Sequence, residues 1–139
     1  MAFAVLLSGC GANDGDPSVC TPVLEPRRSS SVEDSLAKQQ NPDWQLVRAE
    51  ACVHRQAYRL AKSPDPAPIV AKAVVVYCEA PIDGVARVSA HSEIDAAADD
   101  LVTSEELSAL ADRIAEIKTN FESYALSKVV EGRAGKCRA

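Results

Sequence analysis

The chain has 139 residues, which favours one domain with a single modest core. Hydrophobic residues make up 47% and charged residues 25% of it, so its composition is that of an ordinary globular protein and excludes a disordered polyelectrolyte. The net charge of −5 argues against nucleic acid as a partner, because affinity for phosphates is mostly electrostatic.

Four residues near the start stand in a restrictive order, Leu7-Ser8-Gly9-Cys10. This order resembles the lipobox of bacterial lipoprotein precursors, in which the chain is cut before the cysteine and the sulfur receives a diacylglyceryl group. The resemblance implies a partial signal peptide over residues 1–9, lipidation of Cys10 with fatty acids such as palmitate, and a place in the bacterial cell envelope facing the periplasm. Because residues 1–7 are apolar without any Lys or Arg, we expect the recorded start to lie inside a longer precursor.

The next region, residues 10–43, is rich in Gly, Pro, Ser, Asp and Asn and has no sustained helical or strand period. This composition predicts a disordered N-terminal tether, which would span on the order of 30 Å by coil statistics. One alternative stays open inside it. Ser31 to Gln40 can form a short helix, with Ser31 as N-cap and Asp34 three residues on.

Residues 44–132 are predicted to form an all-α domain, a small bundle of three to four helices. Aromatic residues are only 4% of the chain, and small apolar side chains suit closely packed helices. The first helix is expected from Trp44 to Lys62, with Asp43 as N-cap and Ser63-Pro64 as its stop. Its expected buried face recurs at helical spacing and comprises Leu46, Ala49, Val53, Ala57 and Leu60.

Asp65-Pro66 predicts the start of the next helix, with Asp65 as N-cap and Pro66 in the first position. The following run, residues 69–77, is apolar on almost every side and β-branched, so a buried strand is the alternative to a central helix. Pro81 and Gly84 are expected to break or kink this helix, and a further helical stretch is predicted over residues 82–101.

The last helix has the clearest signal. Thr103 to Glu106 matches a capping box, in which Thr103 caps the helix and Glu106 reaches back. Apolar residues then alternate steps of three and four and predict one buried face: Leu107, Leu110, Ile114, Ile117, Phe121 and Tyr124. Gly132 and Gly135 are expected to end this helix, which leaves a short basic tail over residues 133–139.

Besides Cys10 the chain has four cysteines, and an even number is typical of an oxidising compartment. Four cysteines permit three pairings. A helical hairpin turning near residue 64 would bring Cys52 and Cys78 to similar height, so we expect a Cys52–Cys78 disulfide and, by elimination, a Cys20–Cys137 disulfide. The alternative for Cys52 and Cys78 is a pair of reduced, buried thiols.

One basic stripe is the best candidate for a binding surface. It lies opposite the buried face of the first helix and consists of Arg48, Arg55, Arg59 and Lys62. Arginines can bind phosphates or carboxylates bidentately, so the stripe is a possible anion-binding site for an envelope protein or an anionic glycan. The alternative is a solvated face paired with acids such as Asp112 and Glu116 of a neighbouring helix.

The sequence contains few residue patterns that are typical of an active site. Cys52 and His54 are two residues apart, so on a helix they point roughly 200° away from each other and cannot share a proton. His54 is expected to be a half-buried bundle residue. His91, Asp95 and Asp99 recur every four residues, but this spacing is a weak metal motif. We therefore predict no catalytic residues, no metal site and no cofactor.

Four short stretches resemble segments of small uncharacterised bacterial proteins: Ala51 to Arg55, Ala57 to Ala61, Asp65 to Ala67, and Val70 to Cys78. This resemblance implies no activity. The sequence as a whole predicts a non-enzymatic envelope lipoprotein acting in interaction or scaffolding. The alternatives are a periplasmic ligand- or inhibitor-type binding module that uses the basic stripe, and a cytosolic helical adaptor.

Overall fold

The computed structural model describes Cys20, residues 31–97 and residues 103–136, with side chains placed up to residue 89 and again from residue 103. Its helices are α2 (Val32–Gln40), α3 (Pro42–Leu60), α4 (Ala67–Tyr77), α5 (Glu79–Ala97) and α6 (Ser104–Arg133). These described ranges contain no strand, so the predicted all-α class is confirmed. The apolar run of residues 69–77 is a helix, and the strand alternative is wrong.

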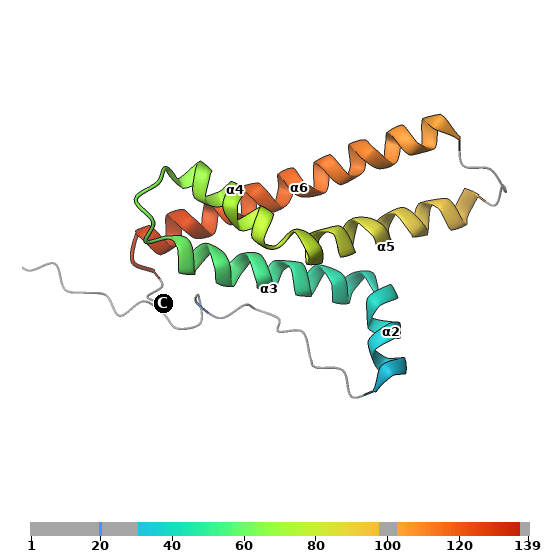
Figure 1. The fold of residues 1–139 in the computed structure, drawn as a ribbon, viewed down its shortest axis with the longest axis horizontal. Coiled ribbons are helices and arrows are strands. Elements are labelled where there is room, and N and C mark those ends of the chain that lie inside the picture. Colours follow the sequence, from blue (N-terminus) through green and yellow to red (C-terminus); the bar gives the residue numbers. More distant parts are fainter. Residues whose placement is uncertain (1–19, 21–30, 98–102, 137–139) are drawn as a thin grey trace, which may run out of the picture.

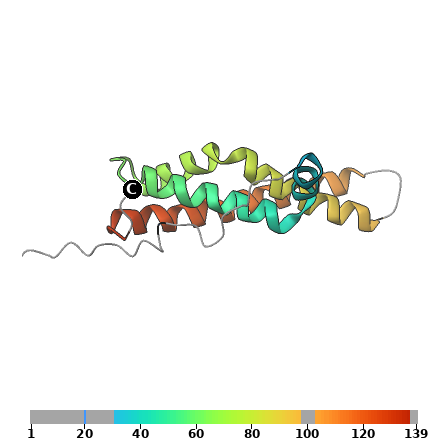
Figure 2. The same cartoon turned by 90° about the horizontal axis from the view of Figure 1, so that it is seen from below.

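The helices form an elongated bundle (Figures 1 and 2). The long helix α6 packs against α3, α4 and α5, and α3 also packs against both α4 and α5. Figure 1 shows that α4 and α5 follow one another along the bundle with a bend between them, while α2 crosses the beginning of α3. The core lies between these elements, and its largest fully buried side chains are Ile82, Val53, Val74, Val129 and Cys78.

The buried face predicted for α3 is partly confirmed. Ala49, Val53 and Ala57 are buried as expected, and Leu60 packs against the core from a partly buried position. Leu46 was expected in the core but is 41% exposed. It lies in the second turn of α3, where it borders an open groove described below.

Two predicted N-caps are wrong. Helix α3 is capped by Asn41, whose Oδ1 accepts the Trp44 N–H at 2.9 Å, because Pro42 occupies the first helical position and Asp43 is already inside the first turn. Helix α4 follows Pro66 without any side-chain cap. The Asp65 carboxylate instead accepts the Ser63 hydroxyl at 2.7 Å within the loop.

The break between α4 and α5 lies earlier than expected, at Cys78. Pro81 explains this position, because the ring of a proline in a helix clashes with the carbonyl four residues before it, here that of Tyr77. Gly84 does not break the chain but lies inside α5. A Cβ at Gly84 would come within 2.5 Å of the Gln45 Oε1, so this glycine allows α5 to approach α3 closely.

Helix α2 falls inside the range 10–43 that the sequence predicts as a tether. Over Val32–Gln40 the chain is helical, and the Ser31 hydroxyl accepts the Asp34 N–H as N-cap, so the short-helix alternative is the one observed. None of its residues is buried. The Gln45 amide of α3 donates to the Gln39 carbonyl at 2.8 Å and so ties the end of α2 to α3.

The capping box of α6 is confirmed, with the Thr103 hydroxyl and the Glu106 carboxylate bonded reciprocally. Ile117 and Phe121 are buried as predicted, whereas Leu107 is 56% exposed because it lies in the first turn, near the end of the bundle. The helix ends at Arg133, one residue inside the predicted basic tail. Gly135 follows in the left-handed region, with φ of 77°, which favours glycine at a helix C-terminus.

Arg133 fastens the end of α6 to the loop between α3 and α4. Its Nε donates to the Ala61 carbonyl at 3.1 Å, and its terminal nitrogen donates to the Ser63 carbonyl at 3.0 Å and to the Asp65 carbonyl. One guanidinium thus satisfies three carbonyls at this turn of the chain. The loop that reverses the chain is held by a residue about 70 positions later in the sequence.

Gly132 allows α6 to approach the end of α3, and its replacement gives a direct test of this contact. A Cβ there would lie 2.6 Å from the Ala61 Cβ, which has no freedom to move aside. We expect Gly132→Ala to lower the free energy of unfolding by about 1–2 kcal/mol in urea denaturation, because the strain of overpacking exceeds the gain of about 1 kcal/mol in helix propensity.

The double variant Gly132→Ala with Ala61→Gly provides the control. Removing the opposing methyl relieves the clash, so the two substitutions together should destabilise the protein by less than the sum of their separate effects. Additive effects would show that Gly132 and Ala61 are not in steric contact.

Candidate functional site

Cys52 and Cys78 form a disulfide that links α3 to the end of α4, with a Cα–Cα distance of 5.9 Å. The predicted pairing is therefore confirmed, and the alternative of reduced thiols is wrong. Cys78 is fully buried and Cys52 partly so. Cys20 is also disulfide-bonded. Cys137 and the lipidation site Cys10 lie outside the described residues, so the Cys20–Cys137 pairing stays a prediction.

The basic stripe lies on the solvent side of α3 and of the turn after it. Arg48, Arg55 and Arg59 belong to the helix, which ends at Leu60 rather than at the predicted Lys62. Lys62 lies in the turn, and all four side chains are exposed. Arg48 stacks over the Trp44 ring at 5.5 Å from the ring centre. Glu116, one of the acids considered as a partner of the stripe, binds Arg113 of its own helix at 2.6 Å. The helical period thus places three arginines on one accessible face of α3, and Lys62 follows in the turn, an arrangement that anion binding would require.

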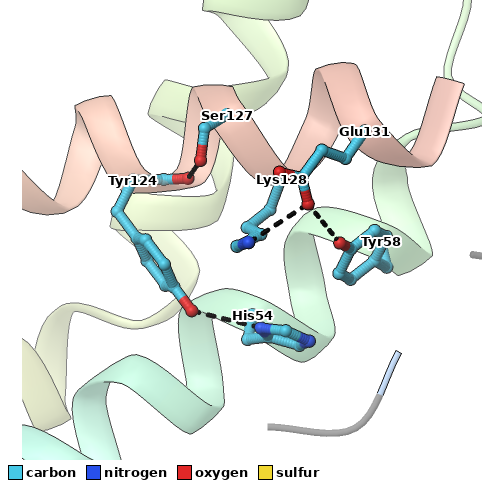
Figure 3. Close-up of polar contacts among 6 residues, drawn as sticks. All are labelled: His54, Tyr58, Tyr124, Ser127, Lys128 and Glu131. Atoms are coloured by element: carbon cyan, nitrogen blue, oxygen red, sulfur yellow. Dashed lines mark hydrogen bonds and ion pairs between the residues drawn. The ribbon is translucent and has the colours of Figure 1, made fainter. Parts of the chain in front are cut away.

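A polar cluster between α3 and α6 was not predicted (Figure 3). The Tyr58 hydroxyl donates to the Glu131 carboxylate at 2.7 Å, and Lys128 donates to the same carboxylate oxygen at 3.1 Å. One turn away, the His54 Nδ1 and the Tyr124 hydroxyl are 3.1 Å apart. His54 is only 4% exposed, so its predicted half-buried position is wrong.

Burial and pairing shift the ionisation of this cluster. Removal from water raises the pKa of Tyr58, and the adjacent Glu131 carboxylate raises it further. The hydrogen bond from Tyr58 has the largest effect on the pKa of Glu131 and lowers it. Burial opposes this shift, and Lys128 lowers the pKa further. Burial likewise raises the pKa of Tyr124. The cluster therefore favours one protonation state, a neutral Tyr58 and an ionised Glu131.

We expect Tyr58→Phe to lower the free energy of unfolding by about 1–2 kcal/mol near neutral pH, because it removes a hydrogen bond to a partly exposed charge. The contribution of Tyr58 is present below its ordinary pKa of 10.0 and is lost above it. That of Glu131, whose pKa is lowered, is present above 4.5 and lost at more acidic pH. Urea denaturation from about pH 3 to about pH 11 measures the loss of stability at acidic pH and the loss at alkaline pH.

Tyr77→Phe is the matched control for this prediction. Tyr77 is 65% exposed, so loss of its hydroxyl should leave both the stability at neutral pH and its pH dependence unchanged. The role assigned to the Tyr58–Glu131 pair would be contradicted by a Tyr58→Phe variant with the stability of the wild type and the same dependence of that stability on pH.

An open groove of about 240 Å³ lies between α3, α5 and α6, next to the polar cluster. Most of its wall is apolar, and its lining residues are Leu46, Glu50, Val85, Ile117, Asn120, Phe121 and Tyr124. This groove could not be predicted from the sequence, because its walls come from three helices. Its volume is below the range typical of drug-sized ligand sites.

Helix α4 presents a second unpredicted surface. Its large exposed apolar side chains are Ile69, Val76 and Tyr77, which are 56%, 71% and 65% exposed. Together with the exposed Ala73 they are spaced at four, seven and eight residues from Ile69 and share one side of the helix. We call this set the α4 apolar face.

All three side chains of the weak metal motif lie outside the described ones. His91 and Asp95 lie on α5, where only the backbone is described, and Asp99 lies outside the described residues. Among the side chains that are described, no group of three His, Cys, Asp or Glu could hold a metal ion. None of the described helices has the length and apolar character needed to cross a bilayer.

Comparisons with protein-family models, with curated proteins and with solved structures find no match to this chain.

Proposed function

We propose that this chain is a non-enzymatic lipoprotein of the bacterial cell envelope, anchored to a membrane through Cys10 and facing the periplasm. Its folded part, a bundle of three to four helices, would act in interaction or scaffolding rather than in catalysis. The Leu7-Ser8-Gly9-Cys10 order supports the anchor, and the disulfide-bonded cysteines support the location.

The Cys52–Cys78 disulfide is the observation that carries this proposal. Disulfides persist in the periplasm and other oxidising compartments and are rare in the cytosol, where thiols are kept reduced. This disulfide joins two elements of the core, so it is part of the folded structure rather than the product of adventitious oxidation of surface thiols. A fold built around such a bond fits an exported protein.

Metabolic labelling with a radioactive or clickable fatty acid tests the anchor. We expect label on the wild-type protein, none on the Cys10→Ser variant, and an intact Cys52–Cys78 disulfide in both by non-reducing peptide mapping. A soluble, unlabelled product that keeps Met1 and carries free thiols at Cys52 and Cys78 would contradict the proposal. That result would favour the cytosolic helical adaptor.

The second candidate is a periplasmic module that binds a ligand or an inhibitor-type partner through the basic stripe, and the exposure of all four cations of the stripe favours it. Arg55→Ala with Arg59→Ala should weaken binding of an anionic glycan, measured by calorimetry. The matched control, Lys72→Ala with Arg87→Ala, removes two exposed cations away from the stripe and should leave binding unchanged. Equal binding by both double variants would contradict this candidate.

A further inference from the structure

The α4 apolar face has the pattern of a helix that is covered on both sides. Val70, Ala71 and Val74 point into the core, whereas Ile69, Val76 and Tyr77 stay more than half exposed on the other side. Isolated exposed apolar residues are normal, but a contiguous patch with a polar rim marks an interaction site. We propose that the α4 apolar face lies on the membrane surface to which Cys10 anchors the protein. This inference rests on the proposed function and names its partner.

The charges on and around α4 favour a lipid surface. The helix has no acidic residue, although the whole chain has a net charge of −5, and the one charge on it is the exposed Lys72. No residue of α4 itself therefore repels anionic headgroups. At the end of the face, Glu79 and Asp83 are held by Lys118 at 3.2 Å and 3.5 Å, which offsets the first acidic residues beyond it. Next to them Tyr77 offers the amphipathic ring typical of membrane interfaces.

The small size of the face argues against a second copy of the chain as its occupant. Helix α4 has 11 residues and is about 16 Å long, so the face covers on the order of a few hundred Å². A stable dimer buries about 800 Å² on each partner. A membrane needs less, because an anchored domain is already at high local concentration beside it.

The test uses the full chain without its acyl group, the Cys10→Ser variant, so that attachment through lipid cannot mask the contact. We expect it to float with vesicles of equal parts phosphatidylethanolamine and phosphatidylglycerol, weakly but measurably. Adding Val76→Asp should lower the partition coefficient about tenfold or more. The substitution removes two methyl groups that would enter the membrane and introduces a charge there. The matched control Leu107→Asp replaces another exposed apolar residue, 56% exposed on α6, and should leave the partition unchanged.

A second readout locates the contact. In Tyr77→Trp, brominated lipids should quench the new fluorescence, whereas the wild-type Trp44, on α3, should stay unquenched. Equal partition of Val76→Asp and Leu107→Asp, or no quenching of Trp in Tyr77→Trp, would overturn the inference. So would a dimer by light scattering that Val76→Asp dissociates, because the face would then join two copies. Loss of partition in Val76→Asp without fatty-acid label at Cys10 in the wild type would support this face and contradict the lipid anchor.

Discussion

The double variant Cys52→Ala with Cys78→Ala should unfold with a free energy about 3.5 kcal/mol lower than that of the wild type. The two cysteines are 26 residues apart, and in the chain-entropy model a cross-link across such a loop stabilises the folded state by this amount. Urea denaturation measured by circular dichroism provides the value. For a small domain this is a large share of the total stability, so partial unfolding at 37 °C is also expected.

Two controls separate the cross-link from other effects. Reduction of the wild type also breaks the disulfide of Cys20, whereas the double alanine variant removes only the link between α3 and α4. The variant Cys20→Ala therefore measures the contribution of the other disulfide to stability separately. A loss of less than about 1 kcal/mol in the double variant would contradict the prediction and would mean that helix packing alone fixes this hairpin.

Local signals in the sequence predicted much of the fold. The Thr103–Glu106 capping box and the spacing of Ile117 and Phe121 depend on residues within one or two helical turns, and both are observed. The Cys52–Cys78 pairing was predictable because a short loop forces neighbouring helices to run antiparallel. Such features need no knowledge of distant parts of the chain.

The wrong predictions have two physical sources. Asn41 and Asp43 can both cap a helix, and the choice depends on Pro42, which fits only at the first helical position. Leu46 and Leu107 continue the helical spacing of apolar residues, but this spacing does not predict how far the neighbouring helix extends. Leu46 faces a groove and Leu107 lies near the end of the bundle, so neither is covered.

Of the candidate surfaces, only the basic stripe could be read from the sequence, because three of its cations belong to one helix and Lys62 follows two residues after its end. The Tyr58–Glu131 pair joins residues 73 positions apart, and the nearest signal for it was the matching four-residue spacing of His54 and Tyr58. The α4 apolar face could not be predicted either. Residues 69–77 are apolar on almost every side, with Lys72 as the one charge, and only packing decides which apolar side stays exposed.

The core position with the largest expected effect is Ile82, the largest fully buried side chain of the described residues. Its N–H donates to the Cys78 carbonyl at 3.1 Å, so it lies where the chain bends from α4 into α5. We expect Ile82→Ala to lower the free energy of unfolding by about 3 kcal/mol in urea denaturation, through lost burial and the cavity left behind.

The same substitution at an exposed site tests whether burial is the cause. Ile69→Ala, 56% exposed on α4, should change the stability by less than about 0.5 kcal/mol in the absence of membranes. Ile82→Val should lower the free energy of unfolding by about 1 kcal/mol, a loss between those of Ile82→Ala and Ile69→Ala. Equal losses for Ile82→Ala and Ile69→Ala would mean that the α4 side exposed in this structure is covered in solution. The α4 apolar face would then be a buried contact within the protein or between its copies, and unable to reach a membrane.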